Sequence, residues 1–261
     1  MYTYFFIGLF LIGLVSFIDD IRSLPNKYRI FIHLFSMSLL ILQVKEFYSM
    51  PSLILFFLLL VIGVGIVNAY NFMDGINGIT GFYSLITIAT LYFIDVYHIT
   101  FIDKNLLLQV SLSVLVFLFF NFRKIAIGFC GDVGSISIAF IVIFSITMLI
   151  FRTNDLKYIF LLGLYGIDTI YTLLFRIRNG ENIFKAHRSH FYQLLVLDFR
   201  MSHLQVSILY GFVQLLLNLW ILNFSLFSFW FYLPFVFIII IVHTKRKEKG
   251  VALRGFNGVT K

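Results

Sequence analysis

Four short polar segments interrupt an otherwise apolar chain, and each carries side chains that can do chemistry. The first is the pair Asp19-Asp20. Two adjacent carboxylates repel each other, so the pair favours a bound cation or a proton. Taken alone, the pair is also consistent with an ordinary solvated helix end.

The second polar segment, residues 68–81, is the most informative of the four. Side chains with amide or carboxylate groups recur at every third position and are followed by regularly spaced glycines: Asn68, Asn71, Asp74 and Asn77, with Gly75, Gly78 and Gly81. Such a row drifts around an ideal helix but lines up in a tightened or broken one. Glycine lets a ligand approach the backbone closely. The group suits a phosphate, a nucleobase or a hydrated metal, and a purely structural helix end would not need it.

The third segment is Gly131-Asp132-Val133-Gly134-Ser135, which predicts a glycine-rich turn directly before a helix. Free backbone N–H groups at a helix N-terminus bind anions, and the carboxylate of Asp132 could hold a cation beside them. Turns that contain Gly-Asp are common, so this segment is only suggestive by itself.

The fourth segment contains His187, Arg188 and His190. Their imidazoles and guanidinium suit a phosphate or an aromatic base, although an ordinary charged loop explains them equally well. The two histidines lack a third ligand nearby and do not make a metal site by themselves. Together, the four segments offer carboxylates for Mg2+, a helix N-terminus for phosphate and cationic groups for a pyrophosphate. That combination indicates phosphoryl transfer, and the lack of a P-loop lysine motif argues against an ATPase.

The elements that must position these segments are transmembrane helices. Of the 261 residues, 61% are hydrophobic and 12% are charged. The hydrophobic residues form runs of roughly 16 to 20, near the length that crosses a bilayer as a helix. Because an open strand edge cannot face lipid, the fold class is all-α, a polytopic bundle. Nine spans are predicted, at residues 1–18, 28–44, 52–67, 80–94, 106–121, 135–151, 157–174, 204–222 and 226–243.

The distribution of Lys and Arg predicts how the bundle faces. Of the 20 such residues, sixteen lie in 19–29, 121–132, 175–203 and the basic tail at 244–261, and four lie on the other side. The positive-inside rule makes the first side cytoplasmic, so the N-terminus is outside, the C-terminus is inside, and all four polar segments share the cytoplasmic face. The net charge of +8 reflects this bias and attraction to anionic lipid, not a nucleic-acid partner. The single cysteine, Cys130, excludes an intrachain disulfide.

In order and spacing, the segments resemble the polyprenyl-phosphate N-acetylhexosamine-1-phosphate transferases, which include translocase I of peptidoglycan synthesis and O-antigen-initiating enzymes. Asp19-Asp20 matches their aspartate pair, residues 68–78 resemble their Asn-x-x-Asn-x-x-Asp-Gly-x-Asp-Gly run, and residues 131–135 match their Gly-Asp-x-Gly-Ser segment. Residues 188–190 match the start of their histidine motif. Asp168 matches an Asp-Thr pair of the antigen-type branch; a carboxylate at membrane depth is functional by default, but here it could brace its helix.

The resemblance implies a bacterial inner-membrane enzyme that moves N-acetylhexosamine 1-phosphate from a UDP-sugar to undecaprenyl phosphate on the cytoplasmic face and releases UMP. It implies Mg2+, with Mn2+ as a substitute, as the cofactor. The metal is assigned to Asp132 and Asp74, and the lipid phosphate to Asp19 or Asp20. The donor is assigned to six residues: Asn68, Asn71, Asn77, His187, Arg188 and His190.

Departures from the family pattern leave alternatives open. Asn77 stands where many members have aspartate, and Tyr192 and Gln193 replace the closing histidines, which favours surface-polysaccharide initiation over the peptidoglycan translocase. Members usually carry further spans before the aspartate pair, so an inactive, shortened member is one alternative. A secondary transporter is another, although it would place its polar groups near the membrane midplane. The sugar, the glycan pathway and a homodimer stay open.

Overall fold

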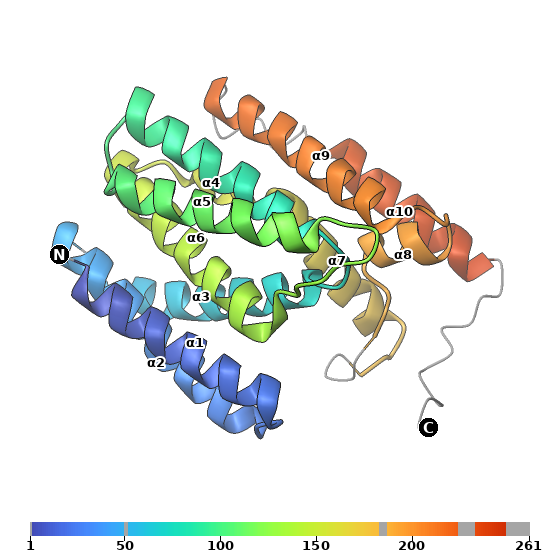
Figure 1. The fold of residues 1–261 in the computed structure, drawn as a ribbon, viewed down its shortest axis with the longest axis horizontal. Helices are drawn as coiled ribbons and strands as arrows, with labels where there is room; N and C mark the ends of the chain where they lie inside the picture. Colours follow the sequence, from blue (N-terminus) through green and yellow to red (C-terminus); the bar gives the residue numbers. More distant parts are fainter. Residues whose placement is uncertain (1, 50–51, 183–186, 224–232, 249–261) are drawn as a thin grey trace.

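The computed structural model describes residues 2–49, 52–182, 187–223 and 233–248, and these residues form helices and no strands (Figure 1). The helices are α1 (Thr3–Ile21), α2 (Asn26–Phe47), α3 (Leu53–Met73), α4 (Ile79–Tyr97), α5 (Lys104–Asn121), α6 (Gly131–Thr153), the 3-10 helix η1 (Leu156–Leu162), α7 (Gly163–Arg178), α8 (Phe191–Leu197), α9 (His203–Asn223) and α10 (Leu233–Glu248). Eight segments of the described chain are long and apolar enough to cross a membrane, namely α1 to α6, η1 with α7, and α9. The prediction of an all-α polytopic membrane protein is confirmed.

Two helix ends differ from the prediction, and both carry polar segments. α3 continues to Met73 instead of ending at residue 67, so the helix itself carries Asn68 and Asn71. α6 begins at Gly131 instead of residue 135, so Asp132 lies in its first turn and not in a turn before it. The early start of α6 is possible because a carboxylate from α1 accepts hydrogen bonds from its first backbone amides. The predicted ninth span overlaps α10, but its first part, in residues 224–232, lies outside the described residues. Most of the basic tail, residues 249–261, also lies outside them.

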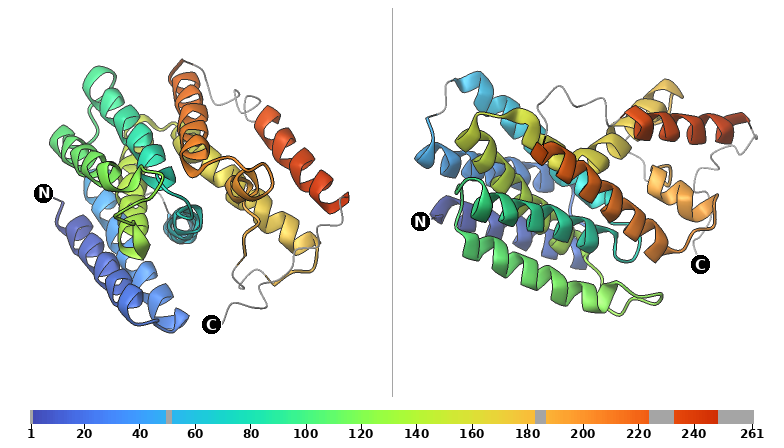
Figure 2. Two further views of the ribbon diagram at one scale, coloured as in Figure 1. Left: turned by 45° about the vertical axis from the view of Figure 1, so that its right-hand side comes forward. Right: turned by 90° about the horizontal axis from the view of Figure 1, so that it is seen from above.

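Helix α6 lies at the centre of the bundle. It packs against α1, α2, α3, α4 and η1. The neighbouring helices α1 and α2 lie side by side at one flank, whereas α9 and α10 lie at the opposite flank (Figures 1 and 2). Rings stack between α1 and α6, where the centroids of Phe5 and Phe144 are 4.3 Å apart. The polar segments are therefore carried by the ends of helices that pack tightly along their lengths.

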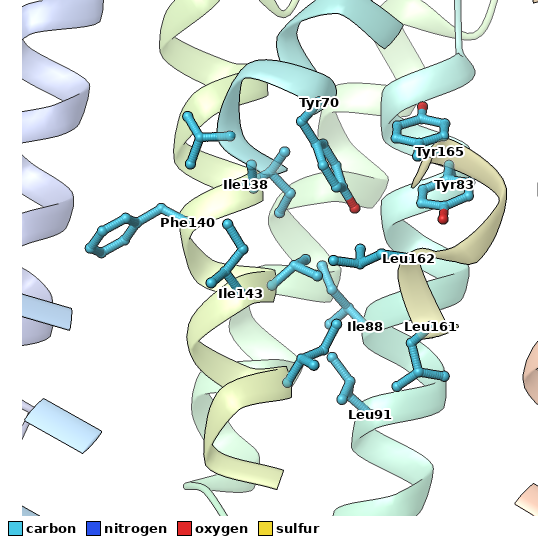
Figure 3. Close-up of a cluster of buried hydrophobic side chains, with 14 of the residues drawn as sticks. Tyr70, Tyr83, Ile88, Leu91, Ile138, Phe140, Ile143, Leu161, Leu162 and Tyr165 are labelled. Atoms are coloured by element: carbon cyan, nitrogen blue, oxygen red, sulfur yellow. The ribbon is translucent and has the colours of Figure 1, made fainter. Parts of the chain in front are cut away.

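Three buried tyrosines, Tyr70, Tyr83 and Tyr165, join α3, α4 and α7 in the core (Figure 3). The rings of Tyr83 and Tyr165 stack with centroids 3.7 Å apart. Tyr83 Oη donates a hydrogen bond to Oε1 of Gln214 on α9 at 3.0 Å. The same glutamine oxygen accepts a hydrogen bond from the backbone N–H of Leu164 at 3.1 Å.

This glutamine explains an irregularity that the hydrophobic pattern did not predict. The seventh span was expected to be one regular helix, but it starts as the 3-10 helix η1 and becomes α-helical only at Gly163. Gln214 Nε2 also donates to the carbonyl of Phe160 at 3.3 Å. Because backbone groups without partners are costly in lipid, the side chain from α9 makes the change of helix type tolerable.

Candidate active site

One guanidinium joins the end of α1 to the start of α6. Arg29, in the first turn of α2, places Nη1 2.7 Å from Asp19 Oδ2 and Nη2 2.9 Å from Asp132 Oδ2. The other oxygen of Asp19 accepts a hydrogen bond from the backbone N–H of Leu24 at 2.7 Å, which fixes the turn between α1 and α2. Arg29 thus brings the predicted aspartate pair and Asp132 together. The sequence analysis counted Arg29 only as a positive charge that orients the chain, although a cation ten residues after Asp19 was a usable signal.

Asp20 occupies the N-terminus of α6. Its Oδ1 accepts a hydrogen bond from the backbone N–H of Asp132 at 3.3 Å, and its Oδ2 accepts one from Val133 at 3.4 Å. Gly131 permits this approach, because its φ is 60° and a Cβ there would lie 2.7 Å from Asp20 Oδ2. The backbone amides that were expected to bind phosphate therefore contact a carboxylate of the protein. Asp20 is exposed and these bonds are long, so a more highly charged anion could replace it.

The end of α3 completes this cluster. Ser135 Oγ, in the first turns of α6, donates a hydrogen bond to Asn71 Oδ1 at 3.0 Å. Asp74 follows as the C-terminal capping residue of α3. Burial and the nearby negative charge of Asp132 raise the pKa of the Asp74 carboxyl to about 6. The structure therefore places Asn71 and Asp74 beside Asp132.

The other two asparagines of the row have structural partners. Asn68 Nδ2 donates to the carbonyl of Val64, one turn earlier in α3, at 2.8 Å. Asn77 Nδ2 donates to the carbonyls of Arg123 at 2.9 Å and Lys124 at 3.3 Å, which supports the segment between α5 and α6. Of the three asparagines, Asn71 is the one whose side chain reaches the start of α6. The assignment of Asn68 and Asn77 to the donor stays a prediction.

The fourth polar segment leads into α8, which lies on the bend between α3 and α4. Tyr192 Oη donates a hydrogen bond to the carbonyl of Phe72 at 3.0 Å. A Cβ at Gly75 would collide with the same hydroxyl, so glycine is required there. The rings of His190 and Phe72 are 6.2 Å apart. Helix α8 thus closes one side of the space next to the end of α3.

Asp168 holds α8 in this position. Its side chain is fully buried on α7. The carboxylate accepts hydrogen bonds from four groups, which are Phe191 N at 2.8 Å, Tyr192 N at 3.2 Å, Tyr210 Oη at 2.6 Å and Thr172 Oγ1 at 3.2 Å. His190 Nδ1 lies 3.3 Å from the same carboxylate. Asp168 therefore joins α7, α9 and the histidine segment, which is the geometry of a brace.

His187, Arg188 and His190 of the histidine segment differ in access. His190 is 2% exposed, and no hydrogen-bond partner for its Nε2 occurs among the described residues. His187 Nδ1 lies 2.9 Å from Ser189 Oγ. Burial, with a smaller contribution from the nearby Arg176 guanidinium, lowers the pKa of His187 to about 4. Arg188 is the exposed member of the three and the one best placed to meet a ligand from solution.

The carboxylate oxygens of Asp132 and Asp74 fit a divalent cation. No group of three or more His, Cys, Asp or Glu side chains arranged to hold a metal occurs in the described parts of the chain. Mg2+ does not need such a cage, because it usually takes one or two protein carboxylates with water and substrate phosphates. Asp132 is partly exposed, lies near the Asp74 carboxylate and already binds one cation, the Arg29 guanidinium. The Asp132 carboxylate is thus positioned to pair with a positive charge.

Comparison with known proteins shows the family of this chain. The sequence model of glycosyl transferase family 4 matches residues 2–150. A probable undecaprenyl-phosphate N-acetylglucosaminyl 1-phosphate transferase from Bacillus subtilis is 26% identical over 250 residues, which are 90% of this chain and 69% of the relative. A phospho-N-acetylmuramoyl-pentapeptide-transferase from Dictyoglomus thermophilum is 31% identical over 187 residues, which are 64% of this chain and 58% of the relative.

A second phospho-N-acetylmuramoyl-pentapeptide-transferase, from Thermotoga neapolitana, is 30% identical over 147 residues, which are 50% of this chain and 48% of the relative. This chain therefore spans about half to two thirds of the length of these relatives. The family match contains the aspartate pair, the asparagine row and the glycine segment at the start of α6. Those three segments gather at one end of the bundle, in which eight segments of the described chain are long and apolar enough to cross a membrane. The chain is a multi-pass inner-membrane protein that belongs to glycosyl transferase family 4.

Proposed function

We propose that this protein transfers N-acetylhexosamine 1-phosphate from a UDP-sugar to undecaprenyl phosphate on the cytoplasmic face of the membrane. The observation that carries the proposal is the meeting of Asp19, Asp20 and Asp132 at one end of the bundle. Family membership supports the reaction class. The Bacillus subtilis relative, whose name gives N-acetylglucosamine as the sugar, matches 90% of this chain, and this supports an N-acetylhexosamine donor.

The reaction is a single displacement at phosphorus. An oxygen of the lipid phosphate attacks the β-phosphorus of the UDP-sugar, the bond from that phosphorus to the bridging oxygen breaks, and UMP leaves with that oxygen. Asp19 or Asp20 receives the lipid phosphate, either by taking its proton or through a cation. Arg188, which is exposed, contacts the pyrophosphate or the uracil of the donor.

The metal belongs to the same proposal. Asp132, helped by Asp74, would hold Mg2+, which when bound neutralises negative charge on the pyrophosphate. Asn71 and Ser135 keep the ends of α3 and α6 together, so the two carboxylates stay near each other. Helix α8, which is seated on Gly75, limits water access from one side.

A lipid acceptor is supported by an apolar cavity along the candidate membrane-spanning helices, which extends toward the helix ends opposite the polar segments. The cavity of about 630 Å³ lies between α2, α3, α6 and η1, and its walls include Leu59, Ile62, Ile143 and Leu162. A polyprenyl chain needs an apolar surface of this kind beside the bundle. The soluble half of the reaction, the nucleotide sugar, would then meet the lipid at the charged ends of the same helices.

A transporter is less well supported by the polar groups in the core. Gln214 Nε2 donates to Asn218 Oδ1 at 2.7 Å, and Asn218 Nδ2 donates to Thr90 Oγ1 at 2.9 Å. These groups are satisfied by each other across α4 and α9, which is how structural polar contacts stabilise a membrane bundle. A translocation path would instead offer such groups to a solute.

The deciding experiment uses the purified protein in nanodiscs and measures UMP release from UDP-N-acetylglucosamine with and without undecaprenyl phosphate. The proposal expects UMP only when the lipid phosphate is present, and none with the Asp132→Asn variant. UDP-N-acetylgalactosamine and UDP-N-acetylmuramoyl-pentapeptide, used in parallel, identify the sugar. Solute uptake into sealed vesicles with no UMP under any condition would establish the transporter instead.

A further inference from the structure

The two terminal nitrogens of Arg29 contact two different carboxylates. A guanidinium that serves one ion pair usually binds both oxygens of a single carboxylate. Here Nη1 contacts Asp19 and Nη2 contacts Asp132, and both contacts use the Oδ2 atom of the acid. One side chain of α2 therefore bridges the end of α1 and the first turn of α6.

We propose that Arg29 is an internal cation that competes with the divalent metal for Asp132. In the metal-free protein its guanidinium occupies the carboxylate that the metal needs, and it must release Asp132 when the metal enters. The inference rests on the metal site of the proposed function, and it adds a residue and a competition that the reaction scheme does not contain.

The competition follows from charge. A guanidinium and a divalent cation on the same carboxylate oxygen would lie within a few ångströms of each other and repel strongly. Asp132 Oδ2 therefore cannot keep the 2.9 Å contact with Arg29 and also ligate a metal well. Binding of the metal through this same oxygen requires the guanidinium to move away.

The neighbouring contacts allow such a movement without loss of the arginine. Asp19 is held separately by the backbone N–H of Leu24 and keeps its contact with Nη1, so Arg29 can leave Asp132 and remain in place. The Arg29 side chain is 25% exposed, which leaves room for a change of rotamer. The freed Nη2 would then face the substrate phosphates that arrive with the metal, and a guanidinium binds these well.

The anion position beside Asp132 shows the same arrangement. Asp20 accepts hydrogen bonds from the first amides of α6, where a phosphate would be expected to bind. The cation position is held by Arg29 and the anion position by Asp20, both from the α1–α2 region. The resting site is thus neutralised by side chains of the protein, and ligand binding exchanges those internal contacts for external ones.

The test measures metal binding directly, without turnover. The purified full chain in detergent is titrated with Mn2+ and the free ion is followed by electron paramagnetic resonance, for wild type and Arg29→Gln. The matched control is Arg22→Gln, which removes the same charge at the end of α1, before the turn into α2. Arg22 is exposed and makes no side-chain ion pair within the described residues. We expect Arg29→Gln to bind Mn2+ roughly threefold to tenfold more tightly than Arg22→Gln does, because a partly exposed ion pair is worth about 1 kcal/mol.

Further variants assign the gain to Asp132. Adding Asp132→Asn to Arg29→Gln should abolish the tighter binding. Arg29→Lys keeps the charge but has no fork to span two acids, so its Mn2+ affinity should fall between those of wild type and Arg29→Gln. Without metal, Arg29→Gln should unfold at a lower temperature than Arg22→Gln, and Mn2+ should restore it.

Three results would overturn the competition. Equal Mn2+ affinity in Arg29→Gln and Arg22→Gln would show that Arg29 does not compete, while an Asp132-dependent site in wild type would leave the proposed metal site intact. Weaker binding in Arg29→Gln would show that Arg29 organises the carboxylates for the metal. Absence of Mn2+ binding in all well-folded variants would remove both the competition and the metal of the proposed function.

Discussion

Asp20 and Asp168 do the same chemical thing in two different parts of the molecule. Each is a carboxylate from one helix that accepts hydrogen bonds from the first amides of another. Asp20 is exposed and accepts from α6 at 3.3 and 3.4 Å. Asp168 is fully buried and accepts from α8 at 2.8 and 3.2 Å, with additional contacts from Tyr210, Thr172 and His190.

The difference separates an exchangeable contact from a permanent one. Hydrogen bonds to a charge are worth more where water is excluded, and breaking a buried network leaves several groups without partners. An exposed carboxylate at a helix N-terminus contributes only about 0.3–1 kcal/mol and is replaceable by water or another anion. We infer that the region around Asp20 is built to exchange partners, whereas the region around Asp168 is built to keep them.

Asp20 and Asp168 should differ most in how much they contribute to stability. Asp168→Ala leaves the amides of α8 and the Tyr210 hydroxyl without their acceptor, so it should destabilise the protein by about 3–5 kcal/mol. Asp20→Ala should lower stability by less than about 1 kcal/mol. Thermal unfolding of both variants in the same detergent measures this. Similar melting temperatures for the two variants would show that burial does not distinguish the two aspartates.

For activity we expect the opposite: a change beside Asp20 should reduce turnover more than a change at Asp168. Asp132→Asn, next to Asp20, keeps the shape of the side chain but removes its charge, so turnover should fall at least about 100-fold. Stability should fall by only about 1 kcal/mol, through loss of the partly exposed ion pair with Arg29. Asp168→Asn retains a carbonyl acceptor and should reduce turnover less, in proportion to its loss of stability. UMP release across an Mg2+ titration checks both. Near-normal turnover of a well-folded Asp132→Asn protein, with unchanged Mg2+ dependence, would end the proposed role of Asp132.

The contact between α8 and Gly75 offers a smaller test of the region around Asp168. Gly75→Ala introduces a Cβ that collides with the Tyr192 hydroxyl, so it should destabilise the protein by about 1–3 kcal/mol. Gly65→Ala is the matched control on α3, because its Cβ would meet no atom within 4 Å. Removal of the hydroxyl in Gly75→Ala/Tyr192→Phe should recover part of the loss. A melting temperature for Gly75→Ala equal to that of Gly65→Ala would mean that α8 does not rest tightly on this bend.

Two tyrosine hydroxyls, one bound to the charged Asp168 and one to a neutral side chain, test whether the charge matters. Tyr210→Phe removes the shortest hydrogen bond to Asp168, 2.6 Å, and should cost about 1.5–3 kcal/mol because the acceptor is charged. Tyr83→Phe removes a 3.0 Å hydrogen bond to the neutral Gln214 and should cost about 0.5–1.5 kcal/mol. Chemical unfolding of the two variants gives the difference. Equal losses would argue that the charge of Asp168 adds nothing to its bracing role.

Composition and hydrophobic pattern were enough to predict a helical membrane bundle and to locate the polar segments that interrupt it. Runs of apolar residues long enough to cross a bilayer can only be helices, because lipid offers no hydrogen bonds to the backbone. The pair Asp19-Asp20 and the row from Asn68 to Asn77 were visible because their polar types stand out in such runs. The orientation across the membrane, and the assignment of each side chain to a ligand, stay predictions from sequence.

Which of those side chains contact one another could be seen only in the folded structure. Arg29 contacts Asp132 across 103 positions of sequence, and Asn77 turns to the segment after α5 and not to the start of α6. The change from η1 to α7 depends on Gln214, which accepts a hydrogen bond from the backbone N–H of Leu164, 50 positions earlier in the chain. Partners of this kind depend on how whole helices pack, and the pattern along one helix carries little information about the side chain that a different helix brings to it.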